Sequence, residues 1–329
     1  MGTAVGALIL RRVAVSVPLL LLTSLLVFVL VANAGDPLAD LRAQPDVAPE
    51  VIDAQRRALH LDEPVLARYG RWLASAVQGD LGTSIAGRDV AGLLWQRMQV
   101  TLRMIVLAVA LAIGLGLAFG VVGAVRHYSR LDHSLTFLSY VALSLPVFWL
   151  AGLLKEFLAV RLNRLVGRQV LFTVGDADPN LTGPLLERLG NYLGHLALPT
   201  LALMAAPIAV FGRYVRASML DALSADYVRT AEAKGASRPR VVVHHALRNA
   251  LAPFATLVAL NFAHLFAGAV IVERVFGWQG MGQMLLDGVR AADPNVVSAW
   301  LLVTATTVHL VNLLADVAYG WLDPRVRVG

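Results

Sequence analysis

Residues 225–240 read Ala-Asp-Tyr-Val-Arg-Thr-Ala-Glu-Ala-Lys-Gly-Ala-Ser-Arg-Pro-Arg and form a polar segment between two apolar runs. Good helix formers predominate before Gly235, and Lys234 falls in the last turn, where a cation suits the helix dipole. Gly235 can take the left-handed conformation that often ends a helix. Ser237 can cap a following helix, whose first turn tolerates Pro239. The segment therefore predicts a helix, a stop and a second helix.

The composition around this segment is that of a membrane protein. Of the 329 residues, 57% are hydrophobic and 15% charged, and the mean hydropathy is +0.67. Such a chain is too apolar for a soluble protein. It has no cysteine, which excludes disulfides, thiolate metal sites and cysteine nucleophiles. Lys155 and Lys234 are the only lysines, and neither stands in a phosphate-binding loop motif. The pI near 10.0 does not predict nucleic-acid binding, because the basic residues are not gathered into one patch with aromatics.

Six apolar runs are long enough to predict membrane-spanning helices. They cover residues 13–32, 104–125, 135–154, 196–211, 250–272 and 296–320. The first is too long for the apolar part of a signal peptide, although Ala32-Asn33-Ala34 resembles a cleavage site. The fourth is the shortest, and Pro199 and Pro207 are expected to kink it. An even number of spans places both termini on one side.

The distribution of charge favours the cytoplasm for that side. The inner segments then carry 13 basic and five acidic residues, a net charge of +8, whereas the outer segments have a net charge of −1. Positive-inside bias is weighted towards short loops and the ends of spans. Arg161, Arg164 and Arg168 would lie outside and argue against this orientation. The balance predicts a multi-pass protein with cytoplasmic termini.

The first external segment is expected to contain short helices at residues 49–59 and 64–77. Val65, Tyr69, Trp72, Leu73 and Ala76 share one face of the second helix, as core residues do. Another short helix is expected at 284–289, within the loop between the last two spans.

Three strings carry a family resemblance. Asp-Tyr-Val-Arg-Thr-Ala-x-Ala-Lys-Gly ends at Gly235 and is followed by His-Ala-Leu-Arg-Asn-Ala-Leu-x-Pro at 245–253. Glu-Arg-Val-Phe-Gly-Trp-Gln-Gly-Met-Gly occupies 273–282, and Leu-Asp-Pro-Arg occupies 322–325. Together they resemble binding-protein-dependent ABC-importer permeases of the oligopeptide/dipeptide/nickel branch. The more general Glu-Ala-Ala-x-x-x-Gly pattern is only half matched, since Arg229 stands where its Glu belongs.

The resemblance implies an all-α polytopic membrane protein with six transmembrane helices and the ABC type I importer permease fold. It implies an N-terminal transmembrane helix (1–34), an extracytoplasmic helical loop (35–96), a permease domain (97–320) and a cytoplasmic tail (321–329). Within the permease domain, a cytoplasmic coupling loop would cover about 213–249 and an external loop 273–295. The chain would be similar to the first permease subunit of such importers in the bacterial inner membrane.

By the same resemblance, the chain would form half of a translocation path for peptides. Its partners would be a second permease subunit, two ATPase subunits, an extracytoplasmic solute-binding protein, the peptide substrate and the lipid bilayer. It would carry no cofactor, because ATP and Mg²⁺ would be bound by the ATPase subunits, and it would not itself be an enzyme.

The resemblance also assigns candidate sites. The loop that would contact the ATPase contains Asp226, Tyr227, Arg229, Thr230, Ala231, Glu232, Ala233, Lys234 and Gly235. Candidate residues of an external gate are Glu273, Phe276, Gly277, Trp278, Gly280 and Gly282. The alternative for this second set is an ordinary connection with Trp278 at the level of the lipid headgroups.

Polar residues inside the apolar runs provide a third set. His309, Asn312 and Asp316 are spaced i, i+3 and i+7 and share a helix face. Asn261 and His264 are spaced i and i+3 on the fifth span. Intramembrane polar residues line transport paths or pack against polar groups of other helices. Both interpretations stay open for these five.

Two other classes of function are weighed against the importer. A self-contained secondary transporter built on Asp316 and His309 would show paired broken helices in two repeated halves, and no such pair is visible. An intramembrane enzyme would need nucleophile or metal-ligand spacing, which is absent, so no catalytic or metal site is predicted. His244 and His245 are expected to be loop residues. Within the family, nickel or another small solute competes with peptides as the substrate.

Overall fold

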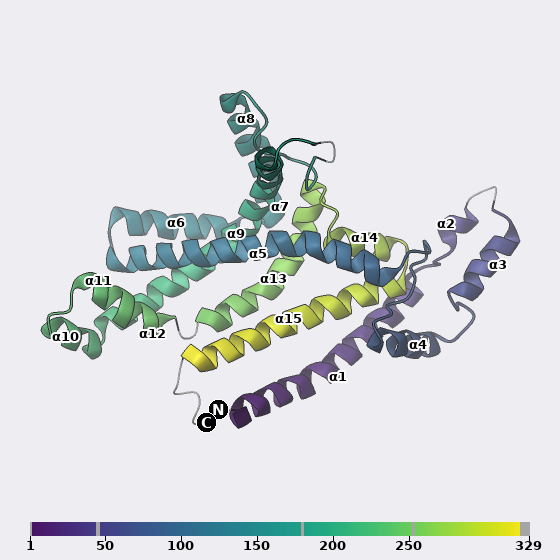
Figure 1. Ribbon diagram of the computed structural model, residues 1–329, viewed down its shortest axis with the longest axis horizontal. Coiled ribbons are helices and arrows are strands. Elements are labelled where there is room, and N and C mark those ends of the chain that lie inside the picture. Colours follow the sequence, from purple (N-terminus) through teal and green to yellow (C-terminus); the bar gives the residue numbers. More distant parts are fainter. Residues whose placement is uncertain (1, 44–46, 179–180, 252–253, 323–329) are drawn as a thin grey trace. The chain divides into compact units, whose positions relative to one another are not determined.

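A computed structural model describes residues 2–43, 47–178, 181–251 and 254–322. The helices seen in Figure 1 that position the sites are, with their bounds, α1 Gly2–Ala34, α2 Ala39–Arg42, α3 Pro49–Ala58, α4 Val65–Val77, α5 Val90–Val125, α6 Arg130–Ser144, α7 Val147–Leu153, α8 Val160–Val166, α9 Leu185–Ser224, α10 Asp226–Ala233, α11 Arg238–Arg240, α12 Arg248–Ala250, α13 Phe254–Phe276, α14 Met281–Arg290 and α15 Pro294–Leu322. Two π-helical segments, η1 Leu154–Ala159 and η2 Val241–Leu247, complete the set.

The predicted all-α membrane fold is confirmed. Within the described residues, five helices (α1, α5, α9, α13 and α15) are long and apolar enough to cross a membrane, and α6 with α7–α8 makes a sixth if this bent pair counts as one span. The expected short helices of the polar segments are observed as α3, α4 and α14. The predicted tail lies outside the described residues beyond Leu322.

The third predicted span is not one straight helix. α6 ends at Ser144, and the chain resumes as α7 after a bend of 108°, visible in Figure 1. The cause is local: Leu145 precedes Pro146 and takes an extended conformation (φ −87°, ψ 122°), as residues before proline prefer. The apolar run at 135–154 therefore contains a break that hydropathy alone did not show.

The fourth span was predicted to be the shortest, and this was wrong. It belongs to α9, a helix of 40 residues that continues through both Pro199 and Pro207. The helix also extends past the apolar run through two arginines that find partners on α6. Arg213 lies over the ring of Tyr140, 4.6 Å from its centroid, and Arg216 pairs with Asp132.

The described chain forms two compact units. The first is built mainly of Leu102–Trp278, and the second of Gly6–Thr101 with Gln279–His309. In the second unit, α4 contributes Tyr69 and Trp72 to a buried cluster with Phe28 of α1, so the predicted apolar face of α4 is core packing. The Tyr69 hydroxyl lies 2.9 Å from Ser24 Oγ and donates to the Leu21 carbonyl, which satisfies its polar end.

In the first unit, two glycines bring α5 close to α9. Gly116 and Gly120 are spaced i, i+4 and therefore lie on one face of α5. A Cβ on Gly116 would lie 2.6 Å from Phe211 Cβ, and one on Gly120 would lie 2.5 Å from Val215 Cβ. Small residues at such positions allow the close backbone approach on which helix packing in membranes depends.

This contact predicts different effects for two alanine substitutions on the same helix. Gly120→Ala should destabilise the protein by about 1–3 kcal/mol, because the new methyl group overlaps Val215. Gly114→Ala is the matched control, since a Cβ there meets no atom within 4 Å. Thermal unfolding in detergent would compare the two variants. Equal stability would show that the close approach at Gly120 does not hold α5 against α9.

Candidate functional site

The polar stretch at 225–240 contains α10, which follows directly after the long helix α9. Ala225 separates the two helices by taking an extended conformation (φ −76°, ψ 150°). Asp226 lies in the first turn of α10, where a carboxylate suits the helix dipole. The Thr230 hydroxyl donates to the Asp226 carbonyl at 2.9 Å. The predicted helix is thus observed within one residue of its expected end.

The end of α10 is a Schellman motif. The Ala236 N–H donates to the Ala231 carbonyl at 3.1 Å, and the Gly235 N–H donates to the Glu232 carbonyl at 2.9 Å. Gly235 takes the left-handed conformation with φ +81°, as predicted. No atom lies within 4 Å of where its Cβ would be, so this position requires glycine for its backbone rather than for space within the chain.

Most of α10 is exposed. Val228 is buried, 2% exposed, and Ala231 is half-buried, so these two face the rest of the unit. The other predicted coupling-loop residues are exposed, namely Asp226, Tyr227, Arg229, Thr230, Glu232, Ala233, Lys234 and Gly235. We call this set the α10 face. It combines an aromatic ring, small residues and charges of both signs on a short, capped helix.

The π-helix η2 lies behind α10 and contacts both α9 and α10. Val241 and Ala246 of η2 are buried, whereas His244 is exposed and His245 half-buried. Ser237 precedes α11 in an extended conformation, but its side chain makes no capping hydrogen bond, unlike the sequence expectation. A cavity of about 570 Å³ remains between these elements, lined among others by Leu220, Glu232 and Val242.

An ion pair ties α9 to the beginning of α6. Arg216 donates through Nε and a terminal nitrogen to the two oxygens of Asp132, at 2.6 and 2.7 Å. The Asp132 side chain is 3% exposed and also accepts a hydrogen bond from the backbone N–H of Tyr128 at 3.0 Å. Ser129 caps α6 by accepting from the Asp132 N–H. Because Arg216 donates two hydrogen bonds and both oxygens of Asp132 accept, the geometry of this ion pair is well defined.

Three separate segments cap the last carbonyls of α13 at its C-terminal end. The Lys155 ammonium donates to the Val275 carbonyl, and the Gly175 N–H donates to the Phe276 carbonyl, both at 2.9 Å. The Trp278 N–H donates to the Glu273 carbonyl at 2.9 Å. These are carbonyls that a helix end leaves without partners, so their capping allows the helix to end here among buried side chains.

The loop that contributes Gly175 is itself fixed to α9. Phe172 stacks on His195, with ring centroids 4.0 Å apart and planes 7° apart, and its N–H donates to the Gly194 carbonyl. Asn163 accepts the N–H groups of residues 170 and 171 through its side-chain oxygen. η1, which carries Lys155, is a π-helix, a rare form that frequently occurs at functional sites.

The candidate gate residues fall at this end and just beyond it. Glu273, Phe276 and Trp278 are buried, with Trp278 only 1% exposed. This differs from the alternative that placed Trp278 at the headgroup level. Gly277 has φ +64° and makes the turn after α13. The remaining two, Gly280 and Gly282, lie in the second unit at the start of α14.

The candidate path residues are dispersed. Asn261 of α13 donates to the Leu257 carbonyl of its own helix at 2.9 Å, and His264 is exposed. His309 Nδ1 lies 3.3 Å from Ser16 Oγ of α1, which is polar packing between helices. Asn312 is half-buried on α15. The side chain of Asp316 lies outside the described residues.

Sequence reasoning did not single out several residues that hold these sites. Lys155 carried a signal, because it is one of two lysines and interrupts an apolar stretch. Asp132 and Arg216 appeared only as charges in the topology count, since nothing in the sequence pairs residues 84 positions apart. Asn163 carried no visible signal.

In a comparison with known proteins, two family models match the chain. The model for "Binding-protein-dependent transport system inner membrane component" matches residues 112–328, and the model for the N-terminal part of the membrane component of such systems matches residues 6–111.

The chain is also similar to curated proteins along nearly its full length. It is 43% identical to the oligopeptide transport system permease protein OppB of Mycobacterium tuberculosis, covering 97% of this chain and 98% of that protein. It is 36% identical to AppB of Bacillus subtilis, covering 98% and 99%. It is likewise 36% identical to the dipeptide transport system permease protein DppB of Escherichia coli K12, covering 97% and 98%. Among solved structures, a chain of the inward facing MetNI methionine ABC transporter matches with a TM-score of 0.54 and 17% identity, covering 70% of this chain and 96% of that one. This last likeness supports the fold.

The ion pair between α6 and α9 predicts a measurable coupling. Asp132→Ala and Arg216→Ala should each destabilise the protein, because each leaves a charged partner without its hydrogen bonds. The double variant should lose less than the sum of the two, by about 1–3 kcal/mol. Unfolding in detergent would measure all three variants, with Asp221→Ala as the control at an exposed position of α9. Additive losses would mean that the pair contributes nothing as a unit.

Proposed function

The chain belongs to the family of binding-protein-dependent transport system inner membrane components, and from this premise we propose that it is the permease subunit of an ATP-driven peptide importer. Relatives named as oligopeptide and dipeptide permeases support peptides as the substrate class. The chain then works with a second permease subunit, two ATPase subunits and an extracytoplasmic solute-binding protein. ATP and Mg²⁺ are bound by the ATPase subunits, in keeping with the absence of a phosphate-binding loop motif here.

The single observation that carries this proposal is the α10 face. A short helix with a fixed stop projects exposed side chains, while Val228 anchors it from behind. In our proposal this face inserts into a groove of an ATPase subunit. A contact that transmits movement has to be rigid, and the Schellman motif at Gly235 supplies that rigidity at the end of the helix.

The contacts of α10 provide a route for the movement. α10 packs against α9 and η2, and Arg216 connects α9 to α6 through Asp132. A displacement of α10 by the ATPase would therefore move α9 and α6 together. On this reading the ion pair is a positioning element, and the predicted coupling loop at about 213–249 includes both its arginine and α10.

The orientation belongs to the same proposal. With α10 in the cytoplasm, both termini are cytoplasmic and the segments 35–96 and 273–295 are extracytoplasmic. The net charge of +8 on the inner segments against −1 on the outer ones supports this arrangement. The capped end of α13 then lies on the extracytoplasmic side.

The translocation path and the gate are assigned within this frame. We propose that Asn261, His264, Asn312 and Asp316 contribute to one half of the path, with the second permease supplying the other half. His309 has a described partner in Ser16, which makes it the weakest member of the set. The buried side chains at the end of α13, Glu273, Phe276 and Trp278, suit an outer gate because a closed gate has to exclude water.

Two substitutions at Gly235 test the docking of α10. Gly235→Val should weaken it by about 1–3 kcal/mol, because a β-branched residue is strained at φ +81°. Gly235→Asn is the matched control, since asparagine tolerates this conformation far better. The measurements are co-purification of the ATPase subunits and substrate-stimulated ATP hydrolysis in reconstituted vesicles. Valine should reduce both and asparagine should largely keep them.

Ala233→Asp tests the same contact without strain in the chain. Ala233 is exposed, so an aspartate there is tolerated until a partner buries it without a counter-charge. ATPase association should fall while membrane insertion stays normal. If Ala233→Asp and Gly235→Val both keep normal association and coupled uptake, α10 is not the docking element.

A further inference from the structure

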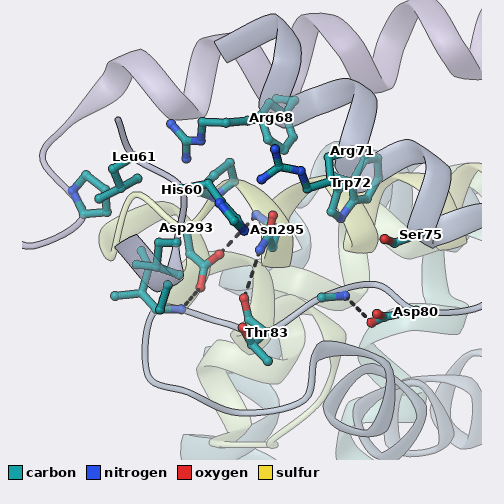
Figure 2. A pocket seen from close by; sticks show the side chains of 17 residues that line it. His60, Leu61, Arg68, Arg71, Trp72, Ser75, Asp80, Thr83, Asp293 and Asn295 are labelled. Atoms are coloured by element: carbon teal, nitrogen blue, oxygen red, sulfur yellow. Dashed lines mark hydrogen bonds between the residues drawn. The ribbon is translucent and has the colours of Figure 1, made fainter. Parts of the chain in front are cut away.

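The second unit contains a pocket that the proposed function does not use. The cavity has a volume of about 260 Å³ and lies between α4, the turn before it, the segment 80–85 and the start of α15. Figure 2 shows that Arg68 and Arg71 approach it from one side, with Thr83 and Asp80 on the other. Phe28 and Trp72 are among its apolar lining residues.

The two arginines of the pocket differ in their partners. They are spaced i, i+3 and lie on one face of α4. Arg71 donates to both carboxylate oxygens of Glu63 at 2.7 Å, and this hydrogen bond is the main reason why the pKa of Glu63 lies below its ordinary value. Arg68 makes no hydrogen bond to any residue that the structure describes. Its guanidinium lies over the Phe28 ring, 6.0 Å from the centroid.

Arg68 therefore has N–H donors that no described residue uses, at a position partly shielded from water. Its side chain is half-buried, and burial lowers the pKa of the guanidinium, an effect that the Glu63 carboxylate partly opposes. A guanidinium has five N–H donors in a planar fork that matches a carboxylate. An anion with two acceptor oxygens would therefore match the donors of Arg68.

The opposite wall of the pocket is acidic and well fixed. Asp293 is buried and accepts the backbone N–H groups of Ile85 at 2.7 Å and of Asn295 at 3.1 Å. Asn295 donates in turn to the Thr83 carbonyl, as Figure 2 shows. Asp80 uses one oxygen to accept from the Gly82 N–H at 2.8 Å. Asp80 is an exposed residue, and its other oxygen has no hydrogen bond within the described chain, so it can accept one from a ligand.

The charges and the volume together restrict the ligand. A cationic wall facing an acidic one suits a molecule that carries both charges. A cavity of about 260 Å³ is smaller than the about 300–1,000 Å³ of sites for drug-sized ligands, which limits the ligand to a few residues of peptide at most. We propose that this pocket binds a zwitterionic dipeptide, with its C-terminal carboxylate on Arg68 and its ammonium group towards Asp80.

The inference rests on the proposed function for the class of ligand, since a dipeptide here is a molecule of the transported kind. It gives the permease a substrate site of its own, separate from the candidate path residues of α13 and α15. Such a site would hold a peptide at the extracytoplasmic segment of the chain before it enters the path. If the Arg68 guanidinium were only a solvated surface group, it would show no preference for the end groups of a peptide.

The test is peptide binding by calorimetry to the full transporter complex in lipid nanodiscs, without the solute-binding protein and without ATP. The probes are Ala-Ala and its C-terminal amide, which lacks the carboxylate. Ala-Ala should bind at least about tenfold more tightly than the amide, because charge-assisted hydrogen bonds are the strong ones. This comparison needs no variant and so does not depend on the folding of one.

Substitutions then locate the site. Arg68→Gln should weaken Ala-Ala by about tenfold and leave the weak binding of the amide unchanged. Arg57→Gln is the matched control, an exposed arginine on α3 outside the pocket. Asp80→Asn should weaken Ala-Ala but not N-acetyl-Ala-Ala, which has no ammonium group.

Two results would overturn the inference: equal binding of the acid and the amide, or undiminished binding of Ala-Ala by Arg68→Gln. ATPase association and basal ATP hydrolysis are measured on the same preparations. If these stay normal while peptide binding fails, the pocket assignment alone falls. Failure of the α10 variants to disturb ATPase association would instead remove the proposed function.

Discussion

The structure depends on one constraint, that backbone N–H and C=O groups in hydrocarbon have to find partners within the protein. Long helices meet this demand along their length, so the informative places are those where a helix stops. α13 can end where it does because Lys155, Gly175 and Trp278 take its last free carbonyls. α10, which the proposed function places in the cytoplasm rather than in hydrocarbon, ends through its own Schellman motif at Gly235. Donors within the chain therefore fix both helix ends that matter for the proposed function.

These two helix ends lie in the same unit and differ in burial. The end of α13 gathers buried side chains and a loop fixed to α9 by the stacking of Phe172 on His195. α10 instead leaves most of its side chains exposed, and its rigidity comes from the backbone. The Asp132–Arg216 ion pair joins α6 to α9. In the proposed function, the ATPase acts on α10, and the contacts of α9 and α6 pass its movement on.

Much of this was predictable from sequence because it is local. Hydropathy located the apolar helices, the face containing Tyr69 and Trp72 was recognised as core, and the left-handed conformation of Gly235 followed from its position after a helical run. The rest depends on tertiary partners. α9 proved far longer than its apolar run, and Arg216 in its continuation pairs with Asp132, a pairing that no periodicity encodes. Coordinates were likewise needed for the sharpness of the bend after Ser144, for the carbonyl capping by a lysine, and for the pocket around an arginine that has no hydrogen-bonded partner among the described residues.

The central claim, that the α10 face meets an ATPase subunit, is tested most directly by cross-linking in the assembled transporter. The chain has no cysteine, so Thr230→Cys gives a single labelling site on the exposed side of α10. A photoreactive group attached there should cross-link to an ATPase subunit, whereas the same group at Gly87→Cys, in the segment proposed to be extracytoplasmic, should not. A Thr230 probe that reacts with no ATPase subunit in an intact complex, or that remains open to water-soluble reagents there, would contradict the account.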